Sequence, residues 1–423
     1  MAVPPQKRKT MNEYVLRQRD KALRHSKFEN ILGSVLVILI FWAPTSFMLF
    51  KLALMCMLII INLFRHRYTF LPRTSIVYLI LGIILLDGAW GLLNGVLHQN
   101  LSDSQLISTA PFHLVWPVLL FLLFPCIRGE ERIESLGNII VVSHILIMLY
   151  LLYNFYAMFT GLPVLQIKSE DEVFLYEGRH LGISTNNMHQ LIFTTPFFFT
   201  LGFMGRFNKR VFIIIGIVTL LVNFYTRRTA LLVVNAYCLI FIPFVLYYFF
   251  KYRLKGIKRL TVILCMFVLV IGAYIYQNSR FFKTSFEYYA NHFNPETDIR
   301  YNQREALTKA WLSSPITGVG AGTKIHTYER GWDTGFESTY HSALAYNGLI
   351  GFGLFVLHIY LTLLYLYRKG KMYQNPFYIA FLMGLCMFLI AATTNPVMGT
   401  FDRLVPLYIC IACLLPELKS KTS

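Results

Sequence analysis

Long apolar runs recur along the whole chain, and they constrain the fold more than any other feature. A run of about 17 or more apolar residues can cross a bilayer as a helix. Charged residues make up 14% of the chain, whereas a soluble domain has about 25%. The runs are continuous rather than alternating, which argues against a transmembrane β-barrel. The sequence therefore predicts an all-α polytopic membrane protein of about 12 transmembrane helices. The predicted spans lie near residues 31–44, 48–64, 74–95, 106–126, 136–160, 188–205, 210–226, 229–250, 260–277, 340–366, 375–394 and 403–416.

The positive charges predict the topology of these spans. Pro44 interrupts the first long run, so we expect a hairpin of two helices there. With the N-terminus in the cytoplasm, 26 of the 39 lysines and arginines fall in cytoplasmic segments, as the positive-inside rule requires. Both termini are then cytoplasmic. The net charge of +18 therefore reflects topology and does not indicate a nucleic-acid partner.

The chain divides by composition into five predicted segments. They are a basic cytoplasmic segment (1–30), helices 1–9 (31–276) with a smaller periplasmic loop at 161–187, a large periplasmic loop (277–340), helices 10–12 (341–416) and a cytoplasmic tail (417–423). The first 29 residues contain no apolar core typical of a cleavable signal peptide. All seven cysteines lie in or beside apolar runs, so we expect neither a disulfide framework nor a metal site.

The large loop between helices 9 and 10 is the longest polar interval. A long ordered loop between membrane spans is usually functional. Within it, the stretch from Asp298 to Trp311 favours a helix, and a turn with Gly318, Gly320 and Gly322 follows Pro315. No Gly-Lys-Ser/Thr closes this turn, so it does not fit a P-loop. We expect it to redirect the chain toward the membrane.

Arginines are the second unusual feature of the external segments, where they should be rare. A cluster of external arginines suits an anionic group, because the guanidinium offers a planar fork of donors to phosphate. Charge balanced by nearby acidic residues is an equally good interpretation for each one taken singly, and lipid snorkelling is the alternative for Arg227 and Arg228. The candidates are Arg179, Arg227, Arg228, Arg300, Arg304 and Arg403.

Two carboxylates and one imidazole complete the list of candidates. Glu337 and His341 lie four residues apart at the start of the tenth span. They share a helix face if the helix already runs there, and either could act as a general base. Capping of that helix near Ser338, with an interfacial histidine, is the alternative. Asp87 lies inside the third span, where a charge is costly, so we expect it to have a structural partner. Asn186 or Asn187 is expected to cap the sixth span.

These motifs together resemble the bacterial O-antigen ligase and O-antigen polymerase (Wzy-type) superfamily. Arg300 followed by Trp311, Pro315 and Gly318–Gly322 is similar to the family's signature in its large periplasmic loop. Thr226–Ala230, Arg179 with Gly182, and Gly348–Gly351 resemble three further elements in the expected order. The resemblance covers about residues 170–416. One departure concerns the ligase histidine, because the ungapped spacing to Gly348 places Glu337 there, and His341 lies one helical turn later.

The resemblance implies an inverting, metal-independent glycosyltransferase of the bacterial inner membrane, without a cofactor, that faces the periplasm. Its donor would be an undecaprenyl-diphosphate-linked glycan, and its acceptor either a second lipid-linked glycan (polymerase, our first expectation) or lipid A–core (ligase). Membrane lipids and a chain-length regulator are further partners. Arg228 and Arg300 would bind the diphosphate, and Glu337 or His341 would remove the acceptor proton. Substrate-binding candidates are Arg179, Arg227, Arg304 and Arg403.

Two other classes stay open from the sequence. Twelve spans would also suit a polysaccharide transporter or flippase, although the polar external mass is concentrated in one loop, whereas transporters usually show internal repeats and midplane sites. The second class is a non-catalytic component of a glycan assembly complex. It predicts that single arginine substitutions leave activity intact.

Overall fold

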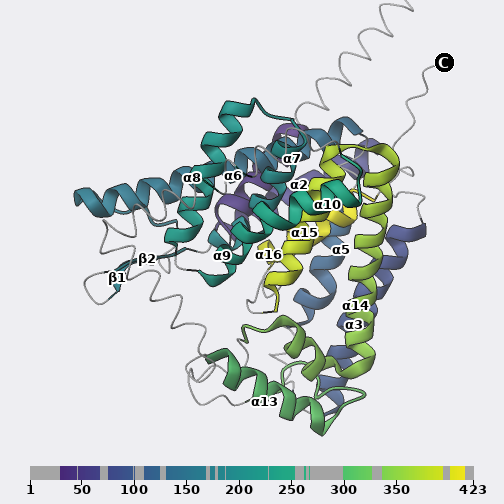
Figure 1. Cartoon of the computed structure of the whole chain (residues 1–423). Coiled ribbons are helices and arrows are strands. Elements are labelled where there is room, and N and C mark those ends of the chain that lie inside the picture. Colours follow the sequence, from purple (N-terminus) through teal and green to yellow (C-terminus); the bar gives the residue numbers. More distant parts are fainter. Residues whose placement is uncertain are drawn as a thin grey trace, which may run out of the picture.

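A computed structural model gives the fold of the chain (Figure 1). It describes residues 29–44, 46–66, 75–98, 100, 109–123, 130–167, 172–176, 180–185, 187–226, 228–252, 262, 266, 299–325, 336–393 and 401–414.

Helices dominate the described residues. A first helix covers Glu29–Trp42. It is followed by α2 (Met48–His66), α3 (Ser75–Leu97), the π-helical turn η2 (Pro111–Val115), α5 (Trp116–Leu123), α6 (Glu130–Thr160), α7 (Met188–Phe203), α8 (Lys209–Tyr225), α9 (Thr229–Ala236), the π-helical turn η4 (Tyr237–Phe241), α10 (Ile242–Tyr248), α13 (Ile299–Ser313), α14 (Thr339–Tyr373), α15 (Pro376–Ala391) and α16 (Phe401–Ala412). Every predicted span except the ninth contains one of these helices. Of the ninth, at 260–277, only residues 262 and 266 are among the described residues.

Four of the described helical segments are long and apolar enough to cross a membrane. They are Ile76–Leu97, Ile133–Ala157, Thr229–Tyr248 and Thr339–Tyr373. Shorter apolar helices accompany them, among them Glu29–Trp42 and Pro376–Ala391. The fold is therefore that of a polytopic helical membrane protein, and the number of twelve spans stays a prediction.

The break expected at Pro44 is present. The first helix ends at Trp42, Phe47 adopts a left-handed conformation (φ 55°), and α2 begins at Met48. The buried Lys51 Nζ donates a hydrogen bond of 2.7 Å to the carbonyl oxygen of Ala43. A cation beside the carbonyl end of a helix is favourable. This contact accounts for a lysine on the side of the membrane where the predicted topology expects few.

The core is built around α7, whose residues are almost all buried. It packs most extensively on α15, where Phe197 meets Phe381 edge-on at 4.9 Å between ring centroids. Glycines permit the close approach of neighbouring helices. A Cβ at Gly202 would strike the ring of Phe212, and one at Gly137 would strike the ring of Phe377. The aromatic side chains therefore fill the space that these two glycines leave.

A short hairpin is the one departure from helix among the described residues. Strands β1 (Glu172–Tyr176) and β2 (His180–Ser184) pair antiparallel, with Glu172 opposite Ser184 and Tyr176 opposite His180. The predicted all-α fold class holds for the described residues, and the hairpin is a local feature of the smaller loop that the sequence did not predict.

The connection from α8 to α9 is as tight as the sequence indicates. α8 ends at Tyr225, and Arg228 stands at the N-cap position of α9 in an extended conformation. Within the helices, Asn223 Nδ2 donates to Asn235 Oδ1 at 2.9 Å. This pair fixes the register of the two helices, since amide groups in an apolar environment favour mutual hydrogen bonds.

Candidate functional site

The described part of the large loop forms a small unit of its own on the first part of α14. Leu307, Ile325, Phe336 and Ala345 form a separate apolar core, and Trp311 packs against it. Trp311 Nε1 also donates to the carbonyl oxygen of Pro315 at 3.1 Å, which closes the end of α13. The helix predicted from Asp298 to Trp311 is thus confirmed as α13. Figure 1 shows α13 at one end of the molecule, where α3 and α14 also end.

The glycine-rich turn after α13 inserts into a break in α14. Gly318, Gly320 and Gly322 all have positive φ angles, of 82°, 86° and 80°. Gly348 interrupts α14 with φ 62° and ψ −167°. Only glycine adopts such angles without strain. The predicted turn toward the membrane is confirmed, and it meets a helix that is broken to receive it.

The turn supplies hydrogen bonds to backbone groups that the break in α14 would otherwise leave unpaired. The amides of Val319 and Gly320 donate to the carbonyl oxygens of Ala345 and Tyr346 at 3.0 and 2.9 Å. On the other side, the amides of Leu349 and Ile350 donate to Pro315 and Ile316 at 3.0 and 3.2 Å. Non-helical backbone at membrane depth needs such partners. Gly348 therefore separates two helical parts of α14, and the motif Gly348–Gly351 stands at the start of the second part.

α3 fixes the same turn from its other side. Asn94 Nδ2 donates to the carbonyl oxygen of Thr317 at 2.6 Å, and Asn100 Nδ2 donates to that of Val319 at 2.9 Å. The amide of Ala321 donates to the Gly91 carbonyl oxygen at 2.9 Å. The loop is thus tied to a long membrane helix by main-chain and side-chain bonds.

Asp87 has the structural partner that the sequence predicts. Its Oδ1 accepts a hydrogen bond of 2.9 Å from Asn347 Nδ2, and Trp90 Nε1 donates to the Asn347 carbonyl oxygen at 3.0 Å. Asn347 directly precedes the break at Gly348. The carboxylate therefore holds the last residue of the first part of α14.

Replacing Asp87 by alanine is expected to lower the free energy of unfolding by about 1–3 kcal/mol, because the half-buried side-chain amide of Asn347 loses its acceptor. Exchanging the two groups, with Asp87→Asn and Asn347→Asp together, should restore most of the loss, since the same bond forms in the opposite direction. Thermal unfolding of the purified variants in detergent measures both effects. Equal melting temperatures for the wild type and Asp87→Ala would contradict the role of the pair.

Arg304 and His341 meet where α13 contacts the first part of α14. The Arg304 guanidinium is close enough to act electrostatically on the His341 imidazole. Arg304 Nε is buried, and among the described residues it has no hydrogen-bond partner. His341 Nδ1 lies 2.7 Å from Ser338 Oγ. A hydrogen bond at Nδ1 orients the ring, and it fixes Nε2 as the base if Nδ1 donates. A buried donor of a cationic group beside an oriented imidazole is an arrangement suited to an anionic ligand.

The first part of α14 is held in place at both ends. The amide of Thr339 donates to the Ala392 carbonyl oxygen at 3.1 Å, and Tyr340 Oη donates to that of Leu389 at 2.7 Å. The other end is fixed by Asp87, as described above. His341 therefore has a defined position relative to α13.

Glu337 lies beside the same site but not on the helix. α14 begins at Thr339, so the helix does not run through Glu337, and the condition for a face shared with His341 is not met. The amide of Glu337 donates instead to Gln303 Oε1 of α13 at 2.9 Å. Ser338 stands at the N-cap position without a side-chain capping bond, because its hydroxyl pairs with His341. Asn187 likewise precedes α7 without capping it, and its Oδ1 accepts from Thr185 Oγ1 at 2.7 Å.

The structure describes the other predicted site residues only in part. Arg300 lies on α13 one turn before Arg304, so the two positions share a helix face. Arg228 opens α9 and is half-buried. Arg403 belongs to α16, and its side chain lies outside the described residues, as does that of Arg300. Arg179 and Arg227 lie outside the described residues altogether. The meeting of Arg228 with Arg300 stays a prediction.

A comparison with protein families gives one match. Residues 211–356 match the O-antigen ligase family. The match confirms the resemblance to the O-antigen ligase and polymerase superfamily over about a third of the chain. It begins in α8 and ends in α14, so it contains Arg228, Arg300, Arg304, Glu337 and His341. Arg179 and Arg403 lie beyond it. A comparison with curated proteins gave no match.

Sequence reasoning missed residues that support Glu337, His341 and the first part of α14 through hydrogen bonds. Gln303 and Asn347 were not predicted to take part, and Ser338 was expected only as a cap. A signal exists for Asn347, because it directly precedes the glycine of the break and lies in an apolar span where an amide needs a partner. Gln303 gives no such signal in the sequence.

Proposed function

We propose that the chain transfers a glycan from an undecaprenyl-diphosphate carrier to a sugar hydroxyl at the junction of α13 and α14. The buried, unpaired Nε of Arg304 beside the imidazole of His341 is the observation that carries the proposal. Diphosphate is a dianionic leaving group, and an arginine that stabilises its developing charge lowers the barrier to transfer. Arg300, one turn away on α13, is the second candidate for this role, and Arg228 the third.

His341 is assigned as the base that removes the acceptor proton. Donation of its Nδ1–H to Ser338 Oγ would leave Nε2 as the acceptor. Displacement by the acceptor oxygen breaks the bond between the anomeric carbon and the phosphate oxygen, inverts that carbon and releases the carrier diphosphate. The proton passes from the acceptor hydroxyl to His341 and then to solvent.

A second lipid-linked glycan is the acceptor that we favour, which makes the enzyme a polymerase of O-antigen or a related polysaccharide in a bacterial inner membrane, with the site facing the periplasm. The spacing of Glu337 ahead of Gly348 supports this choice, since a ligase is expected to carry histidine there. The second candidate is a ligase that uses lipid A–core. The presence of a histidine at the site and the description of the matched family favour it.

Purified protein with a synthetic lipid-linked repeat unit tests the proposal. The wild type should produce a ladder of longer lipid-linked glycans, and His341→Ala should lower the rate by about 10²–10⁴-fold, as expected for loss of a general base. Glu337→Gln should keep the ladder, because it keeps the backbone amide that binds Gln303. A ladder that is lost in Glu337→Gln and kept in His341→Ala would make Glu337 the base.

The acceptor is tested in the same assay. Transfer only after lipid A–core is added would establish the ligase and reject the polymerase. No transfer to either acceptor by folded protein would favour a polysaccharide transporter or a non-catalytic component of an assembly complex.

A further inference from the structure

Gln303 lies within α13 with only 3% of its surface exposed. Its Oε1 accepts the hydrogen bond of 2.9 Å from the Glu337 backbone amide. Because a backbone amide can only donate, this bond fixes which end of the Gln303 side chain faces Glu337. Nε2 therefore points away from Glu337, and the side chain makes no other hydrogen bond among the described residues. Its two N–H donors are left for a ligand or solvent.

The donors of Gln303 lie beside the buried donor of Arg304. The two residues are neighbours on α13 and reach the same short segment, since Gln303 binds Glu337 and Arg304 acts on His341. Arg304 Nε is also without a hydrogen-bond partner among the described residues. Unpaired donors on two adjacent residues of a buried junction are unusual, because nearly all buried polar groups in proteins form hydrogen bonds. The pair therefore points to a ligand.

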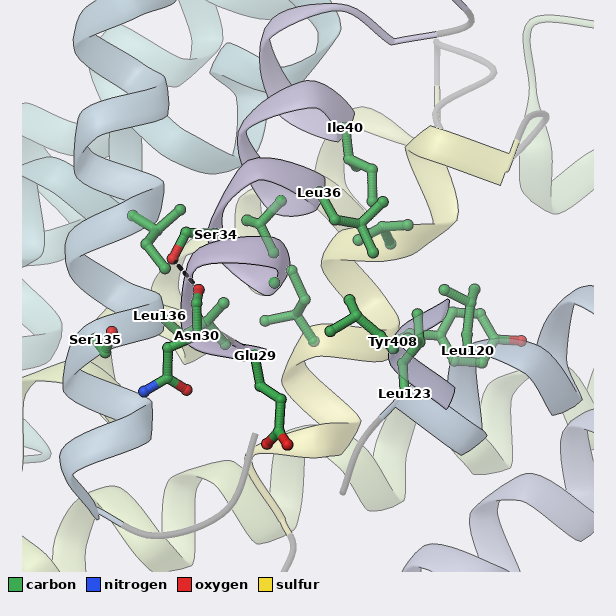
Figure 2. A pocket seen from close by; sticks show the side chains of 16 residues that line it. Glu29, Asn30, Ser34, Leu36, Ile40, Leu120, Leu123, Ser135, Leu136 and Tyr408 are labelled. Atoms are coloured by element: carbon green, nitrogen blue, oxygen red, sulfur yellow. Dashed lines mark hydrogen bonds between the residues drawn. The ribbon is translucent and has the colours of Figure 1, made fainter. Parts of the chain in front are cut away.

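A cavity elsewhere in the molecule is lined differently. Figure 2 shows this cavity between the first helix, α2, α5, α6 and α16, lined mainly by apolar side chains such as Leu36, Ile40 and Leu120. Ser34, one of its polar residues, is paired, since its hydroxyl donates to the carbonyl oxygen of Asn30 at 2.6 Å. The volume of about 90 Å³ has room for a few water molecules. The donors at the junction of α13 and α14 are therefore the better candidate for substrate recognition.

A site that offers donors alone fits phosphate oxygens better than a sugar hydroxyl. Gln303 Oε1 is occupied by the Glu337 amide, and the guanidinium of Arg304 has no acceptor atom. The ionised oxygens of a diphosphate only accept, so they can take these N–H groups without leaving a proton unpaired. A sugar hydroxyl carries an O–H that needs an acceptor, which His341 supplies in the proposed reaction.

We propose that Gln303 is a substrate-binding residue whose Nε2 donates, beside Arg304, to the diphosphate of the undecaprenyl carrier. The inference rests on the proposed glycan transfer. A hydrogen bond to an ionised acceptor is about twice as strong as one between neutral groups, so a neutral amide can contribute to binding an anion. The backbone amide of Glu337 then has a positioning role, because it holds the Gln303 side chain with Nε2 toward the ligand.

Two substitutions remove the Nε2 donors and differ in their side effects. Gln303→Glu keeps an oxygen for the Glu337 amide but adds a negative charge. Gln303→Met adds no charge at similar length but loses the bond to Glu337. A loss that both variants share therefore belongs to Nε2. Asn302→Asp is the matched control, because it makes the same change from amide to carboxylate on the neighbouring, exposed residue of α13.

The measurement is the equilibrium binding of undecaprenyl diphosphate and of undecaprenol to the purified protein in nanodiscs. The ratio of the two affinities reports recognition of the diphosphate, and it does not depend on the folded fraction. Wild type and Asn302→Asp should prefer the diphosphate equally. Gln303→Glu and Gln303→Met should each lower that preference about 10- to 100-fold, as expected for the loss of a hydrogen bond to a charged group.

A preference for the diphosphate that is retained in either Gln303 variant would overturn the proposal. If it is retained in Gln303→Glu and lost in Gln303→Met, Gln303 only holds Glu337. Loss of the preference in Arg304→Ala, with both Gln303 variants unchanged, would reject the role of Gln303 and leave the proposed function intact. A wild type without the preference would reject both. If Gln303→Met fails to fold, a preference retained in Gln303→Glu still rejects the proposal.

Discussion

Replacing Arg304 by alanine is expected to lower the rate of glycan transfer by at least about 100-fold, the usual effect of removing one group that stabilises a transition-state charge. The reason is geometric. Arg304 Nε is buried without a hydrogen-bond partner among the described residues, so this donor is available to an anionic ligand. The rate of ladder formation at saturating donor measures the loss.

Lys309→Ala is the matched control for this experiment. Lys309 lies on the same helix, but its ammonium group is exposed and pairs with Glu305 at 2.7 Å. Its loss should change the rate little, because exposed ion pairs contribute little. Arg304→Lys keeps the charge but lacks the planar fork of donors. Its rate of glycan transfer should therefore lie between those of the wild type and Arg304→Ala. A rate for Arg304→Ala equal to that of Lys309→Ala would reject the assignment of Arg304 to the leaving group.

The sequence predicted the helices well because hydrophobic length and turn residues are local properties. Pro44, the tight connection at Arg228 and the helix before Pro315 are examples that the structure confirms. Each depends on residues close together in the chain. The π-helical turns at Pro111–Val115 and Tyr237–Phe241 and the hairpin at Glu172–Ser184 have weaker local signals, and the sequence did not predict them.

The site was predicted only in part, because its geometry depends on contacts that are distant in sequence. Arg304 and His341 were both candidates, but their meeting requires α13 to fold back on α14. Asn94 and Asn347 take part through bonds to residues more than 200 positions away in the sequence. Asp87 is the instructive exception, because the cost of a charge in a membrane span predicts a partner even where the partner's identity cannot be predicted.

Replacing Gly318 by alanine is expected to have the largest effect on the folded state. A Cβ there would meet the Tyr346 carbonyl oxygen and the Gly348 amide nitrogen. The φ of 82° alone costs about 1 kcal/mol or more in a residue with a Cβ. The clash would also separate Val319 from Ala345 and Gly320 from Tyr346, each bond contributing about 0.5–1.5 kcal/mol.

Gly205→Ala separates the two contributions. Gly205 has nearly the same φ, 77°, but a Cβ there would meet nothing within 4 Å. Gly205→Ala should therefore lower the free energy of unfolding by the conformational strain alone. Gly318→Ala should lower it by that strain and by the loss of the hydrogen bonds as well. Thermal unfolding of both variants in detergent gives the difference. Similar melting temperatures would mean that the turn adapts to the added Cβ at little cost in stability. The break in α14 would then not fix the position of His341.

The two substitutions also differ in what they predict for activity. If the inserted turn holds α13 against the first part of α14, Gly318→Ala displaces Arg304 from His341 and lowers the rate of transfer in the fraction of protein that stays folded. Gly205 lies between α7 and α8 and belongs to neither α13 nor α14, so its substitution should leave the rate of transfer unchanged. Rates normalised to the folded fraction therefore distinguish a turn that positions the site from one that only stabilises the chain. A normal rate in folded Gly318→Ala would assign the turn to stability alone.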